Sequence, residues 1–153
     1  MDDVDVRTTG RLRCDATTFQ RVIMNLSLNA RDAMLEGGEL SLVVRAPDTT
    51  ESAFDVRAPT DFVCVEVRDT GTGIAQDDQG RIFEPYFTTK GEAGTGLGLA
   101  SVREGLRALG GDVVVHSLPG KGATFVTYWP RLDGHAADGD APRTSAAPAA
   151  LQS

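Results

Sequence analysis

The feature that most constrains this fold is a helical apolar pattern followed by two short β-branched runs. Asp15 is a suitable N-cap for the helix, and Gly37-Gly38 ends it. The apolar side chains recur at the spacing of one helix face, and they are Phe19, Val22, Ile23, Leu26, Ala30, Ala33 and Met34. Because such a face is stable only when it packs on another element, the pattern predicts a layered domain.

The remaining elements follow in the order strands, loop, helix, strands. Residues Thr70 to Gly96 are rich in glycine and threonine and predict a loop. The expected elements are strands at Leu40 to Arg45 and Phe62 to Asp69, a helix from Leu97 to Leu109, and a closing hairpin of residues 112–117 and 123–129. Hairpin connections favour an α+β fold, a two-layer α/β sandwich with a mixed, mostly antiparallel sheet and helices on one face.

Composition and charge limit the expected partners. The chain has 153 residues, and we expect one domain over residues 1–132 and a disordered, low-complexity tail over 133–153. A net charge of −7 leaves no broad basic field, so nucleic acid is not an expected partner. No apolar stretch approaches the length of a membrane span, and the distant Cys14 and Cys64 favour buried thiols. We therefore expect a cytoplasmic domain with no membrane segment in this chain.

The predicted first helix carries a polar edge beside its apolar stripe. Asn25, Asn29 and Asp32 project within an arc of roughly 60°. A solvated helix face is the simpler interpretation of these side chains. Asparagine is a mediocre helix former, however, and Mg²⁺ would explain two asparagines one turn apart because amide carbonyls suit that metal.

Two glycine motifs and an aromatic segment follow this helix. Asp69 to Gly73, DTGTG, ends a predicted strand and combines a carboxylate acceptor with glycines that admit a flat ligand. Gly94 to Leu99, GTGLGL, opens the second helix, where free N–H groups favour an anion. Between them, the aromatics of Arg81 to Lys90 either anchor a lid or form a small satellite core. A capped turn and a flexible connector are the alternatives for the glycine motifs, but together the patterns describe a magnesium-nucleotide pocket.

In this order the motifs resemble the catalytic and ATP-binding domain of sensor histidine kinases, of the nitrogen-regulation type, in the larger family that includes gyrase and MutL. The similarity covers Asp15 to Pro130. The matching segments are the N box at Asp15 to Met34, the first glycine box DTGTG, the F box RIFEPYFTTK, the second glycine box GTGLGLA and the turn GKGATF at Gly120 to Phe125. The resemblance implies the Bergerat ATP-binding fold with a flexible lid from Ile74 to Gly94, and ATP and Mg²⁺ as cofactors.

The resemblance also implies residue roles. Asn29 would ligate magnesium, Asp69 would accept the adenine amino group, and the glycines of DTGTG would let adenine approach. Asn25 and Lys90 are the implied catalytic residues, and Thr124 would join a water network beside Asp69. The implied nucleotide-binding residues are Asn25, Asn29, Asp32, Asp69, Gly71, Gly73, Ile74, Phe87, Thr88, Thr89, Lys90, Gly94, Thr95, Gly96, Leu97, Gly98, Leu99 and Thr124.

Two positions depart from the family patterns. Hydrolysing members place a glutamate general base where this chain has Asn25, and an amide cannot take a proton at neutral pH. Slow hydrolysis is therefore expected, with the γ-phosphoryl kept for another nucleophile. Many membrane sensor kinases place a lysine where this chain has Asp32, which shifts the expected phosphate contact to Lys90 and Arg31.

The chain offers no good acceptor histidine. His116 lies in a predicted strand and His135 in the low-complexity tail. We expect the acceptor on a dimerisation helix outside this chain, in the same full-length protein or a separate one, with a response regulator downstream. The predicted function is phosphoryl transfer from Mg-ATP to that histidine in two-component signalling, with the isolated chain a monomer. A serine kinase of the anti-sigma-factor kind and a non-catalytic nucleotide-binding module are the alternatives.

Overall fold

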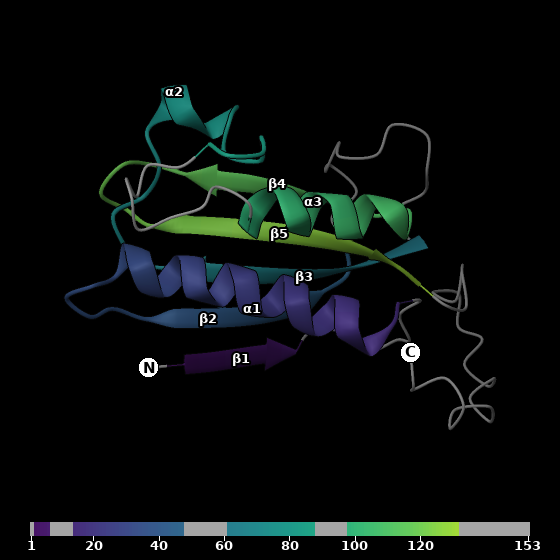
Figure 1. The fold of residues 1–153 in the computed structure, drawn as a ribbon. Coiled ribbons are helices and arrows are strands. Elements are labelled where there is room, and N and C mark those ends of the chain that lie inside the picture. Colours follow the sequence, from purple (N-terminus) through teal and green to yellow (C-terminus); the bar gives the residue numbers. More distant parts are fainter. Residues whose placement is uncertain (1, 7–13, 48–60, 88–97, 132–153) are drawn as a thin grey trace.

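The structure is a computed structural model, and it describes residues 2–6, 14–47, 61–87 and 98–131. Within these ranges a five-stranded sheet is covered by two longer helices (Figure 1). The elements in chain order are β1 (Asp2–Val6), α1 (Ala16–Ala33), β2 (Leu40–Arg45), β3 (Phe62–Asp69), α2 (Gln76–Gln79), α3 (Gly98–Ala108), β4 (Asp112–Ser117) and β5 (Ala123–Pro130). This architecture confirms the predicted α+β sandwich.

The first helix forms where its apolar spacing and its capping residue predict it. The Asp15 carboxylate accepts a hydrogen bond from the Thr18 N–H at 3.0 Å. Hydrogen bonding to the Thr18 side chain, and then to the Thr18 backbone, lowers the pKa of Asp15. The helix ends at Ala33, and Gly37 then adopts a φ of +101° that suits glycine. Of the helices in the described ranges, none is long and apolar enough to cross a lipid bilayer.

The sheet has the order β1-β2-β3-β5-β4. β1 pairs in parallel with β2, and the other three pairs are antiparallel, so the sheet is mixed as predicted. The sequence pattern did not predict β1, because aspartates at positions 2, 3 and 5 are unfavourable in strands and the pairing with β2 is formed across the whole of α1. In the register of β3 with β5, Asp69 lies opposite Ala123.

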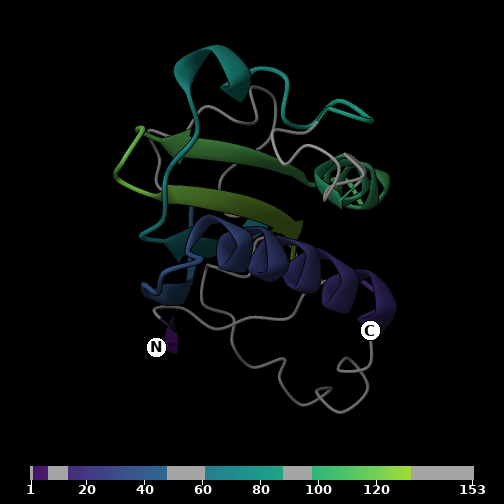
Figure 2. The ribbon, with the colours of Figure 1, turned by 60° about the vertical axis from the view of Figure 1, so that its left-hand side comes forward.

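The main core lies between the two helices and one face of the sheet. Figure 2 shows α1 and α3 on this same face. The helices approach closely, because a Cβ at Gly105 of α3 would lie 3.1 Å from Arg21 Nη2 of α1. The buried members of this core are Val22, Leu26, Val65, Val67, Ile82, Phe83, Val102, Leu106, Val113, Ala123, Phe125 and Trp129. A second buried cluster contains Phe62, Cys64, Val126 and Tyr128.

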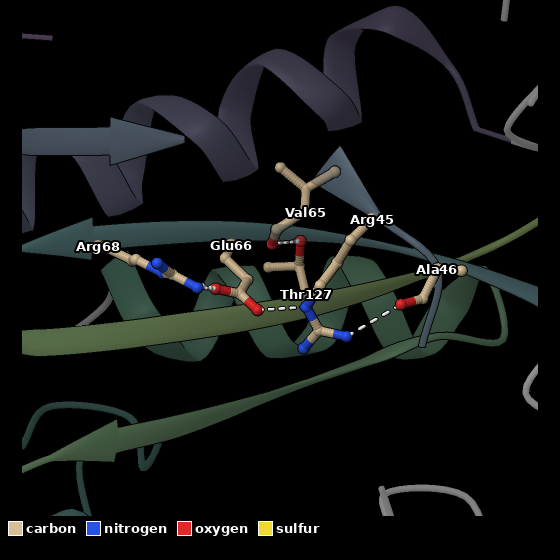
Figure 3. A network of polar contacts seen from close by, with 6 residues as sticks. All are labelled: Arg45, Ala46, Val65, Glu66, Arg68 and Thr127. Atoms are coloured by element: carbon tan, nitrogen blue, oxygen red, sulfur yellow. Dashed lines mark hydrogen bonds and ion pairs between the residues drawn. The ribbon is translucent and has the colours of Figure 1, made fainter. Parts of the chain in front are cut away.

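Polar side chains inside the sheet are paired with partners. Glu66 is only 4% exposed and lies between the guanidinium groups of Arg45 and Arg68, with Arg68 at 2.7 Å (Figure 3). The Thr127 hydroxyl donates to the Val65 carbonyl at 2.7 Å. These contacts compensate the cost of burying a carboxylate and a hydroxyl.

The core predicts that alanine substitution of a buried leucine and of an exposed leucine will change the free energy of unfolding by very different amounts. Leu26 is 1% exposed in the core, whereas Leu35 is 84% exposed just after α1. We expect Leu26→Ala to lower the free energy of unfolding by about 2–5 kcal/mol. Leu35→Ala should change it by about 0.5 kcal/mol or less. Urea unfolding of both variants measures the difference, and equal effects would contradict this description of the core.

Candidate functional site

A buried carboxylate stands at the end of β3. Asp69 is 7% exposed, and its Oδ1 accepts the N–H of Gly71 at 2.9 Å and the N–H of Ala123 at 3.3 Å. Burial raises the pKa of the Asp69 carboxyl, and these two backbone N–H groups partly offset the rise. Its Oδ2 has no donor within the described part of the chain and is not fully buried. One oxygen therefore fixes the side chain, and the other is available to a ligand donor.

The DTGTG loop after β3 is held against the end of α1. The Thr72 N–H donates to the Ala33 carbonyl at 3.2 Å. A Cβ at Gly71 would stand only 2.3 Å from that same carbonyl oxygen, so position 71 admits no larger residue without movement. The sequence suggested that this glycine serves ligand approach, and the structure shows a packing reason for it.

The same loop is also held against the β4–β5 turn. The Gly120 N–H donates to the Thr72 carbonyl at 2.7 Å. Gly73 has a φ of +77°, and a Cβ there would lie 2.3 Å from the Leu118 carbonyl oxygen. The loop is therefore fixed between α1 and the turn, with Asp69 at its base.

Gly98, in the described part of the second glycine box, lies beside α1 at the start of α3. Asn25 and Asn29 are half-buried on α1, one turn apart. Asn25 Oδ1 lies 3.7 Å from the position that a Cβ on Gly98 would take, at the first residue of α3. Asp32, further along α1, forms an ion pair with Arg31 at 3.4 Å. Asn25 is thus beside the first residue of α3, where backbone N–H groups favour an anion.

Residues 74–87, the described part of the predicted lid, are attached to the sheet at their start. The Ile74 N–H donates to Ser117 Oγ at 2.9 Å, and the Gln79 amide donates to the Ile74 and Ser117 carbonyls at 2.9 and 3.0 Å. Gln79 and Ser117 were not predicted, because a contact between residues 38 apart leaves no local signal in the sequence.

Two phenylalanines of the F box fasten the end of the same segment. Phe83 is 8% exposed within the main core, whereas Tyr86 of the same box is 75% exposed. Phe87 is partly buried against the core, and the Arg81 guanidinium lies 4.5 Å from the centre of its ring. Of the implied ligand residues here, Ile74 and Phe87 are thus held in fixed positions.

Thr124 lies on the face of the sheet opposite to the Asp69 carboxylate. Thr124 pairs with Arg68 in the sheet, and strand alternation places it on the face opposite to Ala123. The structure therefore brings Ala123, and not Thr124, to Asp69. Leu99 packs partly buried against the main core. The remaining predicted residues, Thr88, Thr89, Lys90, Gly94, Thr95, Gly96 and Leu97, lie outside the described ranges.

Comparison with known families matches residues 14–133 to a family described as histidine kinase-, DNA gyrase B- and HSP90-like ATPase. The chain belongs to this ATPase family. The match begins just before α1 and ends just after β5, so it includes the whole site described above.

Curated relatives of this ATPase domain are sensor kinases. The sensor kinase CckA of Brucella abortus is 43% identical over 135 residues, which cover 86% of this chain and 14% of CckA. The sensor histidine kinase ZraS of Salmonella typhimurium is 41% identical, over 80% of this chain and 24% of ZraS. The chain therefore spans less than a quarter of the length of these two relatives.

Solved structures share the fold. The catalytic domain of histidine kinase ThkA, in a nucleotide-free form, matches with a TM-score of 0.68 and 27% identity, over 85% of this chain and 79% of that one. Full-length ShkA in complex with AMPPNP matches with a TM-score of 0.65 and 28% identity, over 85% of this chain and 26% of that one. The chain is thus a histidine kinase ATPase domain like those of two-component sensor kinases.

The residues of the site suit a magnesium nucleotide. The described residues contain no cluster of three His, Cys, Asp or Glu side chains that would enclose a metal by themselves. The amide oxygens of Asn25 and Asn29 instead suit Mg²⁺, which keeps several waters and substrate phosphates among its ligands. The donor set of this ATPase domain therefore fits a metal that arrives with a phosphate ligand.

We predict that the packing of the DTGTG loop makes Gly71 much less tolerant than Gly80. A Cβ at Gly71 would stand 2.3 Å from the Ala33 carbonyl oxygen, whereas a Cβ at Gly80 meets nothing within 4 Å. Gly71→Ala should therefore lower the thermal unfolding midpoint, and Gly80→Ala should leave it nearly unchanged. Calorimetric scans of both variants test this, and a harmless Gly71→Ala would show that the loop is not packed on α1.

The raised pKa of Asp69 predicts that the empty Asp69→Asn variant is more resistant to urea than the wild type at pH 7. The pKa of the Asp69 carboxyl is higher in the folded than in the unfolded protein, so ionisation at pH above that pKa lowers the free energy of unfolding. The asparagine amide does not ionise and therefore avoids this loss. The advantage should narrow as the pH falls through the raised folded pKa, and it should vanish below the unfolded value of about 3.9, where the wild-type carboxyl is protonated in both states. Urea unfolding midpoints of both proteins across this pH range test the prediction. A stability advantage of Asp69→Asn that grows on acidification would mean that the pKa of Asp69 is lowered and not raised.

Proposed function

We propose that this domain binds Mg-ATP and donates the γ-phosphoryl group to a histidine on a dimerisation helix outside this chain, in two-component signalling. The observation that carries the proposal is the Asp69 carboxylate, whose Oδ1 is held by two backbone N–H groups while Oδ2 has no donor in the described ranges. Such an acceptor at the edge of a sheet suits the exocyclic amine of adenine. The complex of the similar protein ShkA with AMPPNP supports a nucleotide as the ligand.

The phosphate groups belong at the other end of the site, between α1 and α3. The first turn of α3 presents backbone N–H groups beside Asn25. Asn25 and Asn29 lie one turn apart on α1, and we assign the metal to Asn29. When bound, magnesium neutralises charge on the phosphates. The chain's own part is to orient the nucleotide for in-line attack and to stabilise the charge that develops.

Position 25 favours transfer over hydrolysis. An asparagine amide donates and accepts hydrogen bonds but does not remove a proton from water at neutral pH. Asn25 is the side chain closest to the first residue of α3 in the described site, and it therefore orients the phosphates without activating water. The γ-phosphoryl is thus retained until an external nucleophile arrives.

The acceptor histidine comes from outside the described residues. His116 lies in β4 opposite Thr124, on the face of the sheet that faces away from Asp69. A histidine there cannot reach a phosphate held between α1 and α3. This placement supports a histidine on a separate helix, and a response regulator would receive the phosphoryl group from it.

Calorimetric titration of ADP and a non-hydrolysable ATP analogue, with and without Mg²⁺, tests the binding step. Asp69→Asn should lower the affinity for adenine nucleotides about 10- to 100-fold, because the amide can present an N–H to the adenine amine in place of a charged acceptor. The matched control is Asp77→Asn on α2, where the side chain is exposed. Unchanged affinity in Asp69→Asn would remove this carboxylate from the pocket.

Transfer is tested by supplying a histidine-bearing helix pair with labelled ATP. Asn29→Ala should abolish the increase in nucleotide affinity that magnesium gives, and it should stop labelling of the supplied histidine. The thermal unfolding midpoint should stay close to that of the wild type. An acid-labile product is expected, because phosphohistidine is lost in acid. An acid-stable product would favour a serine kinase, and nucleotide binding with no transfer to any supplied helix pair would favour a regulatory module.

A further inference from the structure

Arg103 connects α3 with Phe83 of the F box and with the start of β4, although it belongs to none of the motifs in the sequence. It lies in α3, and its guanidinium carbon stands 4.4 Å from the centre of the Phe83 ring. Its Nε lies 3.6 Å from Asp112 Oδ1 at the start of β4. This Nε is buried and makes no hydrogen bond with the described residues. The guanidinium is thus placed for stacking on the ring and not for ideal hydrogen bonding.

Phe83 also contacts β5, the strand that holds Asp69 by a hydrogen bond, at the end of the site where adenine is proposed to bind. Its ring meets the edge of Phe125 at a centroid distance of 6.2 Å and an interplanar angle of 89°. Phe125 is two residues along β5 from Ala123, whose N–H binds Asp69. The ring is therefore held between α3, where the phosphates are proposed to bind, and the strand that orients the adenine acceptor.

We propose that Arg103 is a positioning residue for the phosphoryl transfer proposed above, on which this inference rests. Its guanidinium fixes Phe83, and with it residues 74–87, relative to the first turn of α3. The Asp112 carboxylate holds the guanidinium over the ring from the side of β4. Loss of the stacking leaves Asp69 and the asparagines in place, but it loosens the geometry between α3 and the segment that follows the DTGTG loop.

Arg107 provides a matched control in the same helix. It lies one turn further along α3, and its Nε is 3.3 Å from the same Asp112 carboxylate. Its side chain is 56% exposed, and among the described residues it makes no cation–π contact with Phe83. Replacing Arg107 removes an ion pair to Asp112, whereas replacing Arg103 removes the ion pair and the stacking together.

Hydrogen exchange tests the positioning without any need for activity. The N–H groups of Glu84 and Phe87 donate to the Arg81 and Glu84 carbonyls, so they report on the order of this segment. Arg103→Met keeps most of the side-chain volume and should speed their exchange about 3- to 30-fold, the equivalent of a lost cation–π contact. Arg107→Met should leave it unchanged, and Arg103→Lys should restore much of the protection. Equal exchange in Arg103→Met and Arg107→Met would overturn the proposal.

Transfer kinetics with the supplied helix pair add the functional readout. Arg103→Met should lower kcat about ten- to hundredfold with little change in the KM for ATP, because the adenine contact is intact while alignment is lost. Arg103→Lys should recover most of the lost kcat. A kcat equal to that of Arg107→Met would contradict the positioning role. If the wild type itself transfers nothing, the proposed function fails, and the exchange experiment still decides the role of Arg103.

Discussion

The site depends on backbone hydrogen bonds that hold one loop between a helix and a turn. The Thr72 N–H binds the carbonyl at the end of α1, and the Thr72 carbonyl accepts the N–H of Gly120 from the β4–β5 turn. With the loop fixed on both sides, the Gly71 N–H is aimed at Asp69, and a carboxylate can be kept in a buried position. Because both partners of each bond are backbone groups, neither bond depends on the side chain of Thr72. The orientation of Asp69 is therefore a property of the fold.

The elements and site residues that could be predicted from the sequence are those specified by residues close together in the chain. The apolar period and the Asp15 cap of α1 are local, and so are the hairpin residues around Gly120, and the structure confirms these elements. β1 is formed by pairing across α1, and its aspartates oppose strand propensity, so no local pattern indicated it. Thr124 was assigned to the pocket by its motif, but the strand register is what places Ala123 beside Asp69.

The motif residues also carry more than one role. Gly71 was expected to admit adenine, and the neighbouring Ala33 carbonyl shows that it must be small in the empty protein as well. The F box was expected to anchor a segment near the nucleotide, and Phe83 does so by joining the core shared by α3 and β5. A sequence motif records which residues matter, whereas the contacts show which of them support the protein and which remain open to a ligand.

The Glu66 network on the sheet has an evolutionary consequence. A buried carboxylate between two guanidinium groups cannot lose one partner without leaving charge poorly compensated inside the protein. Single substitutions at Arg45, Glu66 or Arg68 are therefore disfavoured intermediates, while replacement of the whole set by apolar residues of similar size is not. These three positions, Arg45 on β2 and the neighbouring Glu66 and Arg68 on β3, are constrained to change in a coordinated way as such domains diverge.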